Sequence, residues 1–117
     1  DTLYIEERIF PAAAIGGAHL VRELIIRAKN EPVGVTVRAW TSPEIAQRTG
    51  ATNNDGWKAD NGPTIFVMGG PAFVRANGSN DSSEPKPLSE LLVPVGFRTG
   101  SDPERPYEAR IRLEYAW

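Results

Sequence analysis

The chain has 117 residues, no cysteine and a formal net charge of −2, from 13 basic and 15 acidic residues. This length suits a single domain (1–117) whose core needs neither a disulfide nor a metal to form. The lack of cysteine excludes a disulfide scaffold and thiolate metal sites. The charge balance does not indicate a nucleic-acid-binding surface. No segment approaches the ~20 consecutive apolar residues that a membrane-spanning helix needs.

The segment TLYIEERIF (2–10) begins the strand-like patterns. Leu3, Ile5 and Ile9 share one parity, and Glu7 interrupts it. Two interpretations stay open: the domain's own first strand, or a strand that pairs with another domain. The segment lacks the basic start and apolar core of a signal peptide, so we expect any exported form to have lost its signal already.

The segment HLVRELIIRAK (19–29) fits two periodicities. A helix would align Val21, Leu24 and Ile25 on one face, whereas a strand would alternate the two halves of the segment across a sheet. We favour the strand, because the flanking segments have β patterns. The next segment, PVGVTVRAW (32–40), predicts a strand with four side chains inward: Val33, Val35, Val37 and Ala39. On the outward face it places Thr36, Arg38 and Trp40.

The middle of the chain contains shorter signals. Ser42 as a cap, Pro43 at a first helical position and Gly50 as a stop predict one short helical turn. The runs PTIFVM (63–68) and PAFVRA (71–76) are separated by Gly69–Gly70, and they predict adjacent strands or one bent strand. The stretches 52–56 and 76–87 are polar and predict a turn and a long loop.

Two strands are predicted near the carboxyl end. In ELLVPVGFR (90–98) one face carries Leu91, Val93, Val95 and Phe97. Pro94 has no N–H, which predicts an edge strand or a bulge there. In PYEARIRLEYAW (106–117) strict alternation puts six residues on the apolar face: Tyr107, Ala109, Ile111, Leu113, Tyr115 and Trp117. Altogether these patterns predict an all-β, antiparallel β-sandwich of about seven strands with one short helical turn.

No pattern predicts catalysis, a cofactor or a metal site. His19 is the single histidine and stands at a strand entry, without the partners that zinc needs. Asp55, Asp60 and Asp81 stand in polar loops but lack EF-hand spacing. Trp117 is expected in the core. Trp40 and Trp57 fit either packing beneath a loop or exposure as binding anchors.

Two segments resemble the cysteine-free, atypical subunits of chaperone–usher fimbriae on bacterial surfaces. ERPYEARIRLEYAW (104–117) is similar to the pilin C-terminal strand, and ELIIRAKNEPVGVTVRAW (23–40) to the family's paired early strands. DGWKADNG (55–62) adds a weaker likeness. The resemblance implies an incomplete immunoglobulin-like fold, completed by the N-terminal strand of a neighbouring subunit.

The same resemblance implies an exported, non-enzymatic adhesion or fibre subunit. Its partners would be neighbouring subunits, a periplasmic chaperone and an outer-membrane usher, with no cofactor. The donor segment would present Leu3, Ile5 and Ile9, and a host receptor would first meet Arg38, Trp40 and Trp57. Two alternatives stay open: a stand-alone periplasmic or viral-surface β-domain that acts as a scaffold or binding module, and an α+β enzyme if 19–29 is helical.

Overall fold

The structure is a computed structural model, and it describes residues 2–12, 19–48, 56–68, 71–77 and 88–117. Over these residues the chain forms strands and their connections but no helix, and so no helix that could cross a bilayer. The strands are β1 (Tyr4–Pro11), β2 (His19–Ala28), β3 (Thr36–Ser42), β4 (Ile45–Gln47), β5 (Trp57–Ala59), β6 (Thr64–Met68), β7 (Phe73–Asn77), β8 (Leu88–Pro94), β9 (Arg98–Thr99) and β10 (Tyr107–Ala116).

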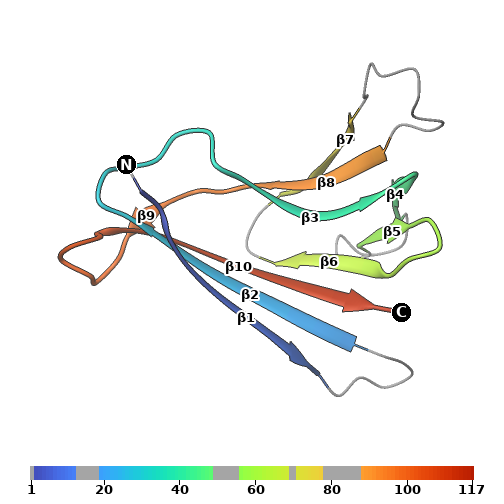
Figure 1. Cartoon of the computed structure of the whole chain (residues 1–117), viewed down its shortest axis with the longest axis horizontal. Coiled ribbons are helices and arrows are strands. Elements are labelled where there is room, and N and C mark those ends of the chain that lie inside the picture. The colour runs from blue at the N-terminus through green and yellow to red at the C-terminus, as the bar shows by residue number, and fades with distance from the viewer. Residues whose placement is uncertain (1, 13–18, 49–55, 69–70, 78–87) are drawn as a thin grey trace.

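These strands form two antiparallel sheets. The larger sheet has the order β1–β2–β10–β6–β5–β4, and β9 pairs with one end of β10. The smaller sheet has the order β3–β8–β7. In Figure 1, β1 and β2 diverge from the smaller sheet toward the lower edge of the view. The all-β prediction is confirmed for the described residues. Their ten strands exceed the expected seven because β4, β5 and β9, of two or three residues each, are too short to show periodicity.

The strand β10 lies in the middle of the larger sheet. It pairs with β2 along ten residues and with β6 along five. Its buried side chains alternate with partly exposed charged ones, so the predicted strand near the carboxyl end is confirmed. The segment 19–28 is also a strand, β2, because pairing on both sides with β1 and β10 satisfies its backbone in an extended conformation.

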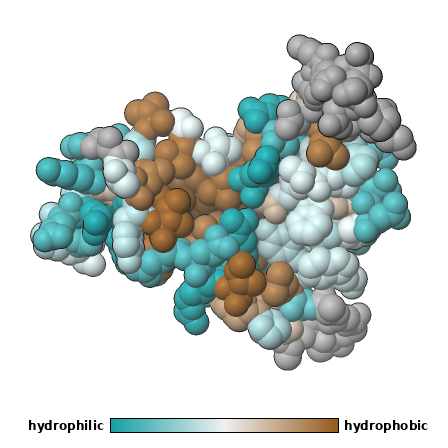
Figure 2. Space-filling model, viewed as in Figure 1, coloured by the Kyte–Doolittle hydropathy of each residue, from teal (hydrophilic) through white to brown (hydrophobic). Residues whose placement is uncertain are grey.

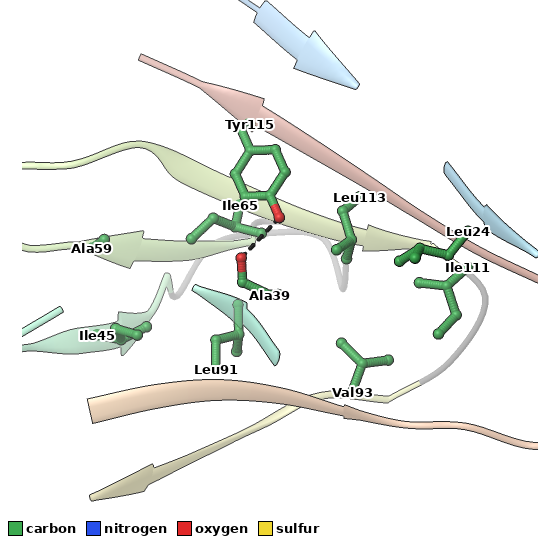
Figure 3. Close-up of a cluster of buried hydrophobic side chains, with 10 residues drawn as sticks. All are labelled: Leu24, Ala39, Ile45, Ala59, Ile65, Leu91, Val93, Ile111, Leu113 and Tyr115. Carbon is green, nitrogen blue, oxygen red and sulfur yellow. Dashed lines mark hydrogen bonds between the residues drawn. The ribbon is translucent and has the colours of Figure 1, made fainter. Parts of the chain in front are cut away.

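The core lies between the two sheets and takes side chains from both. Figure 3 shows residues of β10 and β6 opposite residues of β8 and β3. The buried cluster comprises Leu24, Ala39, Ile45, Ala59, Ile65, Leu91, Val93, Ile111, Leu113 and Tyr115. Burial of these apolar side chains is the main force that holds the two sheets together.

The predicted helical turn over 43–50 is wrong within its described part. Ile45–Gln47 is β4, which pairs with β5, and residues 49 and 50 lie outside the described residues. The hydroxyl of Ser42 does not cap a helix but donates a hydrogen bond to the carbonyl of Asp60 at 3.2 Å. A serine followed by proline suits a corner between strands as well as a helix start, and here pairing with β5 decides the conformation.

A break in register changes the predicted faces of β3. Arg38 lies opposite Leu92 and Trp40 opposite Leu91, so the bulge between them adds Ala39 to this strand. The bulge shifts the alternation by one residue, and Trp40 therefore packs against the core instead of facing outward. Val33, predicted inward, precedes β3 and is 94% exposed.

Two further predictions about strand placement are corrected. The runs 63–68 and 71–76 are neither adjacent strands nor one bent strand, because β6 belongs to the larger sheet and β7 to the smaller one. Pro94 does not mark an edge strand or a bulge, because β8 is the middle strand of its sheet. Pro94 is the last residue of β8, where the ladder of hydrogen bonds ends. Its missing N–H therefore costs the sheet little hydrogen bonding. The predicted polar stretches lie mostly outside the described residues.

The strand β8 holds a buried carboxylate. Glu90, with a side chain 5% exposed, accepts hydrogen bonds from Arg75 at 2.8 and 3.2 Å and from Arg38 at 3.1 Å. The bonds from Arg75, and then those from Arg38, lower the pKa of Glu90. Two cations on the neighbouring strands therefore keep this carboxylate charged.

This arrangement predicts an acid-sensitive contribution to stability. The pKa of Glu90 is lower in the folded chain than its ordinary value of 4.5, so its contribution is complete above about pH 4.5 and is lost as the pH falls through the folded value. We expect Glu90→Gln to be less stable than the unmodified chain at pH 7, and the difference to shrink below pH 4.5. Urea unfolding at several pH values measures it, and a difference that does not change with pH would contradict it.

Candidate functional site

Two sheet edges lie open on the same side of the molecule. Among the described residues, β1 pairs only with β2, and β3 pairs only with β8. Side chains of the larger sheet reach β3: Arg22 donates to the carbonyl of Arg38 at 3.4 Å, and the hydroxyl of Tyr115 donates to the carbonyl of Ala39 at 2.8 Å. The edge β3 therefore lies over β2 and β10, and β1 extends beyond it. Open strand edges are pairing sites for another strand.

The core-facing side of β1 is apolar and largely uncovered. The register places Ile5 opposite Ile26 and Ile9 opposite Arg22, on the face of β2 that also carries Leu24. Leu24 and Ile26 are buried, whereas Ile5 and Ile9 are 54% and 57% exposed. Apolar side chains gather on this side of the molecule, between β3 and the strands β1 and β2 (Figure 2). The smaller sheet thus covers the face of β2 but stops short of β1.

Arg22 joins the two open edges. Its guanidinium donates to the carboxylate of Glu7 at 3.2 Å as well as to β3, and it interacts with the hydroxyl of Tyr115. Burial lowers the pKa of Arg22, but Glu7 and Tyr115 together raise it above its ordinary value. Its Nε is buried without a partner. This partly buried cation is therefore held by a carboxylate of β1 and two oxygen atoms from other strands.

Three aromatic rings continue the site along β3. The ring of Trp40 lies 5.6 Å from that of Tyr115 and 6.3 Å from that of Trp117, measured between centroids. A shallow hollow of about 250 Å³ runs along β3 beside them, lined by Arg38–Thr41. Burial raises the pKa of Tyr115, so this hydroxyl stays a neutral hydrogen-bond donor over the physiological range.

The opposite face of β1, β2 and β10 carries a lattice of ion pairs. Arg27 bridges Glu6 at 2.9 Å and Glu108 at 3.2 Å, one on each neighbouring strand. Arg110, more than Arg27, lowers the pKa of Glu108. On the same face Arg110 pairs with Glu108, Arg8 and Arg112 pair with Glu23, and Arg112 also pairs with Glu114. The imidazole of His19 is hydrogen-bonded to Glu114. This face presents alternating charges to solvent, whereas the core-facing side of β1 presents isoleucines.

The predicted site residues do not form one cluster. Leu3 precedes β1, and Ile5 and Ile9 lie within it, paired with β2 of the same chain. Arg38 is exposed and bound to Glu90. Trp40 and Trp57 are both partly buried and pack against the core. Of these residues, only Ile5, Ile9, Arg38 and Trp40 belong to the open side between β1 and β3.

The strand predicted at the carboxyl end behaves as expected except at its last residue. Tyr107 is partly buried, and Ile111, Leu113 and Tyr115 are buried. Trp117 was expected in the core but is 58% exposed. It follows the last residue of β10 and, although mostly exposed, packs its ring against Trp40 of β3 and against Tyr115.

Sequence reasoning missed the pair of Glu7 and Arg22. Each residue interrupts a pattern of alternating apolar residues. Glu7 stands between Ile5 and Ile9, and Arg22 stands between Leu20 and Leu24. Opposite charges that break two neighbouring patterns are a signal for contact across an antiparallel pair. The signal needed the register of β1 on β2, which the sequence does not supply.

The described residues contain no group of three or more histidine, aspartate or glutamate side chains placed to hold a metal ion. His19 lies at the start of β2, as its position predicted, 2.9 Å from Glu114. The chain matches no model of a known protein family, no curated protein and no solved structure. The open edges of β1 and β3 are therefore the features of the described residues that bear on function.

Proposed function

We propose that the chain is a structural or adhesive subunit of a surface fibre. In this proposal it folds as an immunoglobulin-like β-sandwich and joins its neighbours by strand donation. The observation that supports it is the open edge of β3 next to the uncovered Ile5 and Ile9 of β1. A strand added to β3 would gain backbone hydrogen bonds on one side and apolar contacts below it, which are the two terms that drive β-strand addition.

The donor strand would be residues 2–10 of a neighbouring subunit. Its apolar side chains Leu3, Ile5 and Ile9 would face the core, and its Glu7 would be drawn toward Arg22, the cation on the same side of the site. Donation requires β1 to leave β2 of its own chain. An export pathway with a periplasmic chaperone and an outer-membrane usher belongs to the same proposal, as does the absence of catalysis.

Contact with a host receptor is a further part of the proposal. Arg38 is the most accessible of the three expected contact residues, whereas Trp40 and Trp57 each keep one side against the core. Binding would therefore use Arg38 together with the outer edge of Trp40. Replacing both tryptophans by alanine without loss of cell binding would remove the tryptophans from this role.

A second candidate function is a stand-alone scaffold or binding domain. The pairing of β1 with β2 of the same chain over eight residue pairs favours it, because a domain completed in this way needs no partner strand. The two candidates differ in one measurable property: whether β3 accepts a strand from outside.

A peptide copying residues 2–11 tests the proposal. We expect it to bind the intact chain and to slow amide exchange in β3, because its backbone would pair with that edge. The matched control is the same peptide with Ile5→Asp and Ile9→Asp, which should not bind, because it would bring carboxylates into an apolar site. Unchanged exchange in β3, with a chain that stays monomeric, would favour the stand-alone domain instead.

A further inference from the structure

The outer edge of β1 is suited to pair with a second copy of itself. Its register on β2 fixes the two faces: Tyr4, Glu6, Arg8 and Phe10 lie on the charged face, and Ile5, Glu7 and Ile9 on the core-facing side. Each antiparallel partner uses only half of a strand's backbone groups, so the groups that do not face β2 point toward the open edge. The edge is eight residues long and mostly exposed.

Symmetry limits how two copies of β1 can meet. In an antiparallel pair, residues directly opposite share one face, and two identical strands meet around a two-fold axis. One residue must therefore lie on that axis opposite itself. Near the middle of β1 the axis residue is Glu6, Glu7 or Arg8, and each choice fixes every other pair.

Only the axis at Glu7 places residues of complementary chemistry opposite each other on both sides of the axis. It places Glu6 opposite Arg8 twice on the charged face, and it places Ile5 opposite Ile9 twice on the core-facing side. Tyr4 then lies opposite Phe10, an aromatic cross-strand pair. The charged side chains are accessible, since that of Arg8 is 76% exposed and that of Glu6 is 46% exposed. The four isoleucines would cover the apolar surface that β1 leaves open.

The neighbouring registers place unlike residues opposite each other. With Glu6 on the axis, two Glu6 carboxylates meet and Ile5 lies opposite Glu7. With Arg8 on the axis, two guanidinium groups meet and Glu7 lies opposite Ile9. A charged residue meets its own copy in all three registers, so the flanking pairs decide between them, and only the axis at Glu7 makes those pairs favourable. At the favoured register the two Glu7 carboxylates meet, and each is paired at 3.2 Å with Arg22 of its own chain.

We propose that two copies of this chain form a two-fold dimer through β1, with Glu7 on the axis, so that the two larger sheets become one continuous sheet. This inference goes beyond the proposed function and does not rest on it, because β1 stays on β2 in the dimer but leaves β2 during strand donation. A single eight-residue ladder is a small interface, so the dimer is weak and depends on concentration.

Variants with a single introduced cysteine test the register directly, because the chain has no cysteine of its own. Residues opposite each other in an antiparallel pair have Cα atoms about 4.5–5.5 Å apart, within the range of a disulfide. We expect Glu7→Cys to form a disulfide-linked dimer on mild oxidation. Glu6→Cys and Arg8→Cys are the matched controls, on the same strand and in the other registers, and they should remain mostly monomeric. Equal cross-linking of all three variants, or none of Glu7→Cys, would overturn the proposal.

Charge reversal tests the same interface without cysteine. Arg8→Glu should weaken dimerisation about tenfold or more, because it turns two attractive pairs into two repulsive ones. Adding Glu6→Arg to this variant should restore dimerisation, although the exchange worsens the pairs that each strand makes with Arg27 and Glu23 within its own chain. Circular dichroism checks that both variants fold. Analytical ultracentrifugation measures the dimer, and a double variant no better than Arg8→Glu would contradict the register.

A locked hairpin separates this dimer from strand donation. Tyr4→Cys together with Arg27→Cys would join β1 to β2 at the residue pair farthest from their connection and outside the central contact. The locked chain should still dimerise and slow amide exchange in β1, whereas it cannot donate its strand to β3 of a neighbour. Failure of donation would leave this result unchanged, and loss of the dimer in the locked chain would overturn the proposal.

Discussion

Leu113→Ala should lower the free energy of unfolding by about 2–5 kcal/mol. Leu113 is fully buried on β10, opposite Arg22 on β2 and Val67 on β6, so truncation would leave a cavity between the two sheets, over the middle of the larger one. The strands on both sides are held by their own ladders, which limits how far the site can collapse. Urea unfolding followed by tryptophan fluorescence measures the change.

Leu88→Ala is the matched control for this prediction. Leu88 begins β8 and is 44% exposed, so its truncation removes less buried surface and leaves no enclosed cavity. We expect a loss below about 1 kcal/mol. Equal effects at Leu113 and Leu88 would contradict the placement of the core between the two sheets.

Tyr115→Ala should destabilise the chain by about 3–5 kcal/mol, in the range of large aromatic truncations. Its ring fills the space between β10 and β3 and contacts Trp40, and its hydroxyl donates to the carbonyl of Ala39 at 2.8 Å. Both contributions join the two sheets. The variant should also change the fluorescence of Trp40, because the ring beside it is lost.

Tyr115→Phe divides the effect of Tyr115 between ring and hydroxyl. Phenylalanine keeps the packing but leaves the carbonyl of Ala39 without this donor, which we expect to cost about 1–3 kcal/mol. If Tyr115→Phe were as destabilising as Tyr115→Ala, the hydroxyl rather than the ring would hold β3 in place. If it had no effect, the bond to Ala39 would not contribute to joining the sheets.

The two proposals use different edges of one molecule. Strand donation uses the open edge of β3 and needs β1 of a neighbour, whereas the dimer uses the open edge of β1. A chain in the dimer keeps its apolar Ile5 and Ile9 covered, and a two-fold contact closes on itself instead of growing. Amide exchange in β1 and β3, measured on the same sample, separates the two contacts.

The sequence by itself determined which segments are long strands. Alternation predicted β10, because side chains on successive residues of a strand point to opposite faces. The segment of β2 fitted a helix as well as a strand, and only its β-like neighbours favoured the strand. The many glycines and prolines between short apolar runs favoured several short strands over a few long helices, and the described residues agree. Local signals failed at 43–48, where a serine and a proline suit a helix start but pairing with β5 produced a strand.

Only the tertiary structure decided which strands meet. It placed β6 and β7 in different sheets, turned Trp40 inward through a bulge and left Trp117 partly exposed. It also brought Glu7 and Arg22 together at the open side of β1. The physical reason is that alternation defines the two faces of a strand but carries no information about its neighbours, its register or what covers each face. Those depend on pairing between residues far apart in the chain, and the candidate site consists of such pairs.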